Sequence, residues 1–221
     1  MTFQKYNPAT PKFHKIKPTK RSLSLRRSLF GVGINDADYM VCIKVDGKKA
    51  TCPIYRVWAN MLKRCYCEKY KEVSPTYDGC SVDEGWHKFS AFTNWVESQN
   101  YEGLELDKDI VLAGNKIYSP EMCVFIPHNI NSLLNDRAGA KGKSTTGVTL
   151  KRGRYQANIR IAGSPLCLGT YDTESEAICA YHMAKVQHIE AAALTEGLDQ
   201  RAVSGLHRIA KSIRVKLNFP I

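Results

Sequence analysis

The sequence lacks several patterns that would assign it directly. None of its eight cysteines belongs to a C-x-x-C pair. The basic N-terminus is not followed by the apolar segment of a secretory signal peptide, and no apolar run approaches the length of a membrane span. We therefore expect a cytoplasmic protein with reduced cysteines and no membrane partner. The set Cys65, Cys67, Cys80 and Cys123 leaves a structural zinc site open, but C-x-C is a poor zinc signature and buried apolar thiols are the simpler interpretation.

Acidic residues are also missing from long parts of the chain. Residues 1–35 contain eight Lys and Arg, residues 137–171 contain seven and residues 201–216 contain five, and none of these segments contains Asp or Glu. The acids gather between Glu68 and Asp109. With a net charge of +11 and a pI near 9.3, the chain favours a polyanionic partner. We expect one basic surface and one acidic pocket, with solvated lysine faces as the simpler alternative.

The first half of the 221-residue chain has the pattern of a globular core. Asp46-Gly47 lies between two β-rich runs and predicts a hairpin. Two amphipathic helices follow, one that carries Tyr55 to Cys65 on one face and one over about 87–98. Their apolar faces predict a core made of Tyr55, Trp58, Met61, Leu62, Cys65, Phe89, Phe92, Trp95 and Val96.

The middle of the chain predicts strand, long loop, strand and helix over residues 104–135. Leu104, Leu106 and Ile110 alternate loosely, 123–126 is β-rich, and a helix from His128 buries apolar residues at 130, 133 and 134. Farther on, apolar residues at helical spacing predict a helix over 198–213. That helix could pack on the body of the protein or lie along phosphates.

Residues 147–186 predict three short strands and an amphipathic helix. The strands carry basic side chains interleaved with amide and phenol groups, which suit phosphate oxygens and base edges in a DNA groove. The candidate DNA-binding residues are Lys151, Arg152, Arg154, Tyr155, Gln156, Asn158 and Arg160.

This segment resembles the plant-type AP-two/ERF DNA-binding domain. The matching elements are Gly147-Val148, Tyr155-Gln156-Ala157-x-Ile159, Leu168-Gly169-Thr170-Tyr171, and Glu176-Ala177 through Ala180-Tyr181 to Ala184. The resemblance implies a three-stranded antiparallel sheet backed by one helix, whose strands enter the major groove of double-stranded DNA.

A second resemblance covers the acidic region. Asp107-Lys108, Gly114-Asn115 and Ser119-Pro120-Glu121-Met122-Cys123 are followed by a helix that carries His128 and Asn131. Upstream stand Trp58-x-x-Met61-x-x-Arg64-Cys65, Gly79-Cys80 and Trp86. Together they resemble the HNH (ββα-metal) endonucleases, particularly phage and homing types that carry an appended AP-two domain.

The HNH resemblance implies metal-dependent hydrolysis of a phosphodiester. Asp107 and Asn131, with Asp109 as a further oxygen donor on the same strand face, would bind Mg²⁺ or Mn²⁺. Lys108, His128 and Asn115 are the candidate catalytic residues. Lys108 stands where the family has its base histidine, so the base is open: a lysine with a lowered pKa, or His128. Lys108 could instead bind phosphate, or Asp107, Lys108 and Asp109 could be a surface ion-pair cluster.

We therefore expect an α+β protein that combines an HNH-like ββα-metal unit with an AP-two-like reader. The expected parts are a flexible basic arm (1–35) that adds non-specific DNA affinity, the HNH-like domain (36–137), a linker (138–146), the AP-two-like domain (147–190) and a basic C-terminal helix and tail (191–221). The expected function is a DNA endonuclease in the cytoplasm, of the host cell if the chain is phage-encoded. The alternatives are a non-catalytic DNA-binding regulator on a degenerate HNH scaffold, and an RNA-binding protein or inhibitor. Monomer and dimer both remain open.

Overall fold

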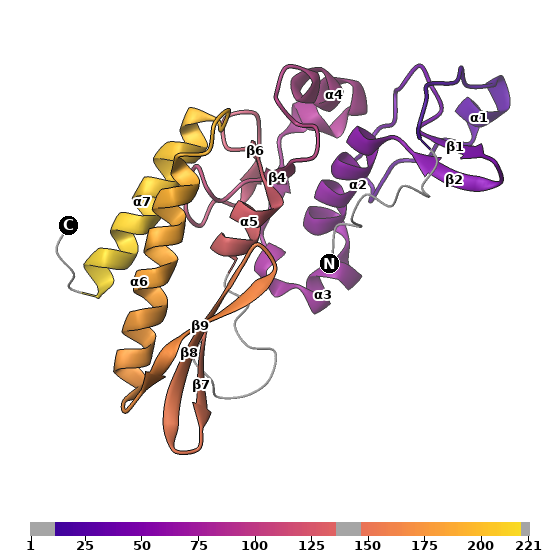
Figure 1. Cartoon of the computed structure of the whole chain (residues 1–221). Helices are drawn as coiled ribbons and strands as arrows, with labels where there is room; N and C mark the ends of the chain where they lie inside the picture. Colours follow the sequence, from indigo (N-terminus) through magenta and orange to yellow (C-terminus); the bar gives the residue numbers. More distant parts are fainter. Residues whose placement is uncertain (1–11, 136–146, 218–221) are drawn as a thin grey trace. The chain divides into compact units, whose positions relative to one another are not determined.

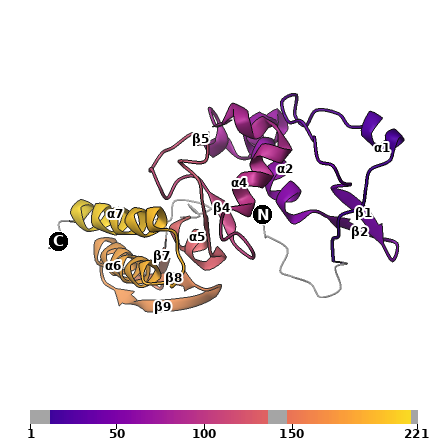
Figure 2. The same ribbon diagram turned by 90° about the horizontal axis from the view of Figure 1, so that it is seen from above.

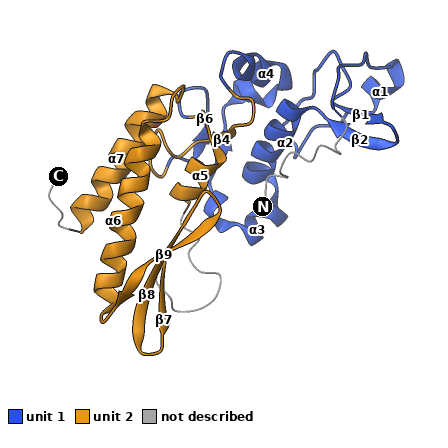
Figure 3. Cartoon of the chain, in the orientation of Figure 1, with its two compact units in different colours: residues 1–100, 115–122 blue, residues 101–114, 123–221 orange. Residues whose placement is uncertain are grey.

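The structure is a computed structural model that describes residues 12–135 and 147–217. In these ranges the chain is mixed α and β, with helices and four small sheets, one of them three-stranded (Figure 1). It forms two compact units: unit 1 contains residues 1–100 and 115–122, and unit 2 contains residues 101–114 and 123–221 (Figure 3). Within the described ranges, no helix has the length and apolar character needed to cross a membrane.

Unit 1 is built on the two predicted amphipathic helices, α2 (Pro53–Tyr66) and α4 (Phe89–Glu97). Their apolar faces form an aromatic core in which Trp58 and Phe92 are fully buried and the rings of Trp58 and Phe89 lie 5.3 Å apart. The indole nitrogen of Trp58 donates to the carbonyl of Trp86 at 2.7 Å, so the one polar atom of that side chain is satisfied. The prediction of this core from helical periodicity is confirmed.

The predicted hairpin is also present in unit 1. Strands β1 (Cys42–Val45) and β2 (Lys48–Thr51) pair antiparallel, and the two turn residues, Asp46 and Gly47, both have positive φ. Two positive φ values define the tight turn whose twist matches that of the flanking strands. Figure 2 shows this hairpin joined to α2.

The rest of unit 1 is made of short elements. They are α1 (Lys20–Ser24), α3 (Glu68–Val73), η1 (Pro75–Tyr77), η2 (Glu84–His87), and the parallel pair β3 (Ser81–Val82) and β5 (Ile117–Tyr118). Residues 12–35, which we expected to be part of a flexible arm, are fixed in unit 1 by Arg26. Its guanidinium donates to the carbonyls of Asn35, Ala37 and Tyr39. Residues 1–11 of that expected arm and the whole of the expected 138–146 linker lie outside the described residues.

Unit 2 begins with the predicted strand, loop, strand and helix. Strand β4 (Glu105–Asp107) pairs antiparallel with β6 (Val124–Ile126), and α5 (His128–Leu134) follows directly. Pro127 lies between the last residue of β6 and the first residue of α5. Its backbone is still extended, with ψ 144°, so the helix begins only at His128. The order of these elements agrees with the sequence prediction.

The three-stranded antiparallel sheet of unit 2 is confirmed. It consists of β7 (Val148–Lys151), β8 (Arg154–Ile161) and β9 (Ser164–Tyr171), joined by two tight turns. Helix α6 (Glu174–Ala193) covers one face and starts with a capping box formed by Thr173 and Glu176. Gly147 just before β7 has φ +79° and lies against the ring of Tyr181 on α6, so a side chain there would be strained and would clash.

The last helix, α7 (Gln200–Lys216), packs on the body of unit 2. One buried cluster joins it to α6, α5, β6 and the turn after β4; its members are Ile110, Val124, Ile126, Ile130, Val186, Ile189, Ala193, Leu198, Ala202, Leu206 and Ala210. A smaller cluster of Val148, Ala157 and Ala177 lies between the sheet and the first turns of α6. Helix α6 therefore belongs to both clusters. Of the two positions left open for the C-terminal helix, packing on the body is the one observed.

Candidate nucleic-acid interface and acidic site

The side chains of β8 alternate strictly between the two faces of the three-stranded sheet. Ala157 and Ile159 are buried on the side of α6. The residues between them point to the opposite side, as the two-residue period of a strand requires. On β7, Thr149 and Lys151 pair with Gln156 and Arg154 across the ladder and share that side. We call this surface the outer face; its polar members are Thr149, Lys151, Arg154, Gln156, Asn158, Arg160 and Thr170.

The basic side chains of the outer face are only weakly held. Arg154 Nε lies 2.9 Å from Oδ1 of Asp172, but both side chains are more than half exposed, so this ion pair contributes little to stability. Arg160 donates to the carbonyl of Gly163 at 2.8 Å and Gln156 to the sulfur of Cys167 at 3.2 Å. Because such exposed bonds exchange readily with other acceptors, these groups are available to an external partner.

Two of the predicted DNA-binding residues lie off the outer face. Tyr155 is half-buried and packs on the small cluster under α6. Arg152 is in the β7–β8 turn, where it has φ +52° beside Gly153 at φ +78°. The structure therefore brings five of the seven candidates together on one surface. It places Arg152 at the tip of the ribbon and turns Tyr155 toward the core.

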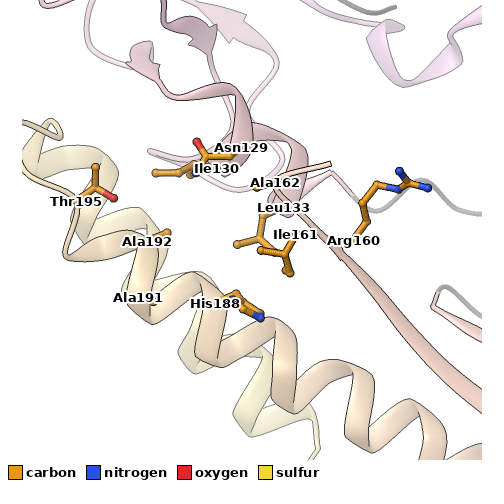
Figure 4. A pocket seen from close by; sticks show the side chains of 10 residues that line it. All are labelled: Asn129, Ile130, Leu133, Arg160, Ile161, Ala162, His188, Ala191, Ala192 and Thr195. Carbon is orange, nitrogen blue, oxygen red and sulfur yellow. The ribbon is translucent and has the colours of Figure 1, made fainter. Parts of the chain in front are cut away.

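A cleft of about 240 Å³ lies where the β8–β9 turn meets α5 and α6. Its polar lining residues are Asn129, Arg160, His188 and Thr195, and the rest of the lining is apolar. Figure 4 shows that the guanidinium of Arg160 points away from α6, whereas His188 extends from that helix. The end of the outer face thus borders α5, the helix that carries His128 and Asn131.

The strongest polar contacts of α5 go to a residue that the sequence patterns did not indicate. Nδ1 of His128 donates to Oε1 of Glu105 at 2.7 Å, and Nδ2 of Asn131 donates to Oε2 of the same carboxylate at 2.6 Å. The Glu105 side chain is 8% exposed, whereas that of His128 is 66% exposed. The buried carboxylate therefore fixes, through Nδ1, the orientation of an imidazole that is mostly exposed. His128 and Asn131 share one helical face, as their spacing predicts.

Asp107 is held by its own turn. Its Oδ1 accepts from the backbone amides of Asp109 at 2.8 Å and Ile110 at 2.7 Å. Burial raises the pKa of the Asp107 carboxyl above its ordinary value, and the two amide bonds and Lys108 offset only part of that effect. Strand β4 ends at Asp107, so the expectation that Asp107 and Asp109 share one strand face is wrong: the side chain of Asp107 draws the chain into a turn at that point.

Lys108 and Asn115 have local partners. The Lys108 side chain is 6% exposed, and its ammonium forms an ion pair with the more exposed Asp109. In unit 1, Asn115 donates to the carbonyl of Ile117 at 2.7 Å and accepts from its amide at 3.1 Å, which fixes the entry into β5. Each of these contacts has a structural role that requires no ligand.

The candidate metal ligands do not form a donor set for Mg²⁺ in this conformation. Asn131 Oδ1 accepts from Asn135, Asp109 is paired with Lys108, and one oxygen of Asp107 is taken by backbone amides. Among the described residues there is no group of three or more His, Cys, Asp or Glu side chains placed to hold a metal ion, and this includes the cysteines considered for zinc. Binding of Mg²⁺ here would require these side chains to exchange partners.

Helix α7 supports the turn that contains Asp107. Gly205 lies against the backbone carbonyl of Ile110, and Arg208 donates to the carbonyl of Val111 at 2.7 Å. The C-terminal helix therefore fixes the acidic turn from behind, a link that helical periodicity alone does not reveal.

Comparison of the chain with protein-family models, with curated proteins and with solved structures gave no match.

Proposed function

We propose that this chain binds double-stranded DNA through the outer face of the β7–β8–β9 sheet. The observation that carries the proposal is the one-sided placement of Lys151, Arg154 and Arg160, with Gln156 and Asn158 between them, on strands that contain no acidic residue. Arginine and lysine bind phosphates and guanine edges, and the amides of Gln and Asn match adenine edges. The major groove admits a two-stranded ribbon, and the antiparallel β7–β8 pair, which carries all three basic residues, is one.

The proposal is tested by fluorescence anisotropy with duplexes selected from a random pool. Arg154→Ala and Arg160→Ala should each weaken binding by about 5- to 150-fold, which corresponds to about 1–3 kcal/mol per contact. Gln156→Ala and Asn158→Ala should in addition change which duplexes are selected. Lys211→Ala is the matched control, because it removes one exposed positive charge from α7 of the same unit.

Two results would contradict this assignment. One is equal losses in Arg154→Ala and Lys211→Ala, which would show that only net charge matters. The other is tighter binding to single-stranded RNA than to duplex DNA, which would point to a different class of nucleic-acid partner.

A second candidate function is phosphodiester hydrolysis of the HNH type, and the Glu105–His128 pair favours it. A water oxygen would attack phosphorus, Nε2 of His128 would accept the water proton, and the leaving oxygen would take a proton from solvent. Glu105 would act as a positioning residue that holds the ring with Nε2 outward. A divalent cation, if bound, would stabilise charge on the phosphate.

Supercoiled plasmid with Mg²⁺ or Mn²⁺ tests the second candidate. We expect nicking that is lost in His128→Ala, reduced with an altered pH profile in Glu105→Gln, and retained in Lys108→Gln, because Lys108 is buried in its own ion pair. Binding of duplex DNA by each variant reports on folding. Absence of nicking by the wild-type chain would overturn the hydrolytic candidate and leave the non-catalytic DNA-binding function in place.

A further inference from the structure

Unit 1 carries a second basic surface, formed by a groove beside the β1–β2 hairpin. The groove has a volume of about 540 Å³. One wall is the segment before α1, which is tied to the hairpin side by a 2.8 Å bond from the amide of Met40 to the carbonyl of Ile16. Its lining consists of Ile16, Thr19, Met40, Cys42 and Ile43 together with three lysines, Lys17, Lys44 and Lys49.

The three lysines are not paired with a carboxylate of any described residue. All three are exposed, and in the described parts of the chain none of them forms an ion pair or a hydrogen bond. No acidic residue lines the groove. Other lysines of unit 1 do have carboxylate partners, as Lys71 has Glu68 at 3.1 Å.

Two of these lysines are also placed unfavourably for the fold. The strand register puts Lys44 directly opposite Lys49, on the side of the hairpin away from the buried Ile43 and Ala50. Like charges that are direct cross-strand neighbours repel and destabilise a hairpin. The arrangement costs stability in the free chain, and an anion between the two ammonium groups would remove that cost.

We propose that this groove, with Lys17, Lys44 and Lys49, binds the sugar-phosphate backbone of duplex nucleic acid. The proposal rests on the DNA binding proposed above and adds a second contact that is independent of base sequence. Charge complementarity identifies the occupant: three ammonium groups supply point charges for phosphates, and the apolar floor contacts sugar rings. Lysine lacks the fixed fork of arginine, so the contact is expected to hold the duplex without selecting its sequence.

The test is the salt dependence of binding for the full-length chain on a duplex of arbitrary sequence. Removing two phosphate contacts in Lys44→Ala/Lys49→Ala should reduce the slope of log K against log salt by about 1.8. The loss relative to wild type should therefore be about 12-fold smaller at 200 mM than at 50 mM salt. Lys44→Gln/Lys49→Gln should give the same slope while keeping a long polar side chain at both positions, and the thermal midpoint of both double variants should equal or exceed that of wild type.

The matched control is Lys69→Ala/Lys88→Ala, which removes two exposed charges from unit 1 outside the groove. An equal change of slope in the control would overturn the proposal, since it would show a general charge effect. Binding of wild type to anionic lipid vesicles, lost in the groove variants without any change in the DNA slope, would overturn it in favour of a membrane surface.

The outcome is separable from that of the sheet. Loss of sequence preference in Gln156→Ala with an unchanged salt slope tests only the outer face. A reduced slope in the lysine double variants, together with outer-face variants that bind as wild type, would support the groove and reject the function proposed for the sheet.

Discussion

The contact between α7 and the acidic turn makes Gly205 the most informative position for a single substitution. A Cβ at residue 205 would lie 2.9 Å from the carbonyl carbon of Ile110 and closer still to its oxygen. Ordinary contact between carbon atoms requires about 3.5–4.0 Å, so the carbonyl carbon alone requires helix and turn to separate by roughly 0.6 Å, and the closer oxygen requires more. Both partners of the clash are backbone or Cβ, so neither can rotate away. The neighbours Leu206 and Ala202 are fully buried, and the helix cannot move without opening the core around them.

The magnitude follows from two opposing effects. Alanine is favoured over glycine in a helix interior by about 1 kcal/mol. Overpacking of a close-packed core costs about 1–3 kcal/mol and more when backbone must shift. We therefore expect Gly205→Ala to lower the free energy of unfolding by about 1–2 kcal/mol, or the thermal midpoint of unit 2 by roughly 4–8 °C.

Thermal unfolding followed by circular dichroism measures this effect. Ser204→Ala is the control, since Ser204 is the preceding residue on the exposed side of α7, and it should be neutral or slightly stabilising. The amide of Ile110 donates to Asp107 in the turn that α7 packs against. Hydrogen exchange at this amide should therefore become faster in Gly205→Ala but not in Ser204→Ala. A Gly205→Ala variant as stable as Ser204→Ala would refute the close approach of helix and turn.

Two further predictions concern carboxylates. Asp199 caps α7 and accepts from the amide of Arg201 at 2.7 Å, so Asp199→Ala should cost about 0.5–2 kcal/mol in urea unfolding at pH 7. The Arg201 guanidinium holds the pKa of Asp199 below its ordinary value, so this stabilisation is present at neutral pH and is lost as the carboxylate is protonated. The difference in unfolding free energy between Asp199→Ala and wild type should therefore shrink as the pH falls through the carboxyl range, and a constant difference would contradict the prediction. Burial raises the pKa of Asp107, so wild type loses stability as the pH rises through that pKa. Asp107→Asn keeps the hydrogen-bond acceptor without the charge, so it should gain stability relative to wild type from acidic to neutral pH. Asp107→Ala, which leaves two amides without their acceptor, should instead be destabilised by about 1–3 kcal/mol, and equal behaviour of the two variants would argue against the turn.

Local patterns were sufficient for much of the fold. The spacing of Trp58, Met61 and Leu62 identified the buried face of α2, because helical period and burial coincide there. Asp46-Gly47 identified the first hairpin, because few residue pairs adopt two positive φ values easily. The residues of β8 were predicted to form one binding surface, but strand alternation places Gln156 and Asn158 on one face and turns Tyr155, which the prediction counted with them, to the other.

Local patterns could not predict the contacts between residues far apart in the chain. The two-residue strands β3 and β5 are too short to show a period, and their pairing joins residues far apart in the chain. Ordering of residues 12–35 depends on Arg26, whose three carbonyl acceptors come from a segment that has no sequence signature. The composition of residues 1–35, basic and rich in serine and proline, is equally typical of a flexible arm.

The carboxylate that meets α5 shows most directly why spacing along the chain was not enough. Glu105 and Asp107 point to the same side of β4, so either could face a following helix. The observed register pairs Glu105 with Ile126 and Asp107 with Val124. Helix α5 starts two residues after Ile126. Glu105, which is opposite Ile126, is therefore the carboxylate within reach of His128. A register shifted by two residues would keep every apolar side chain on its face and bring Asp107 to the helix instead. The choice between the two carboxylates is therefore made by pairing across the sheet, which only the three-dimensional structure reveals.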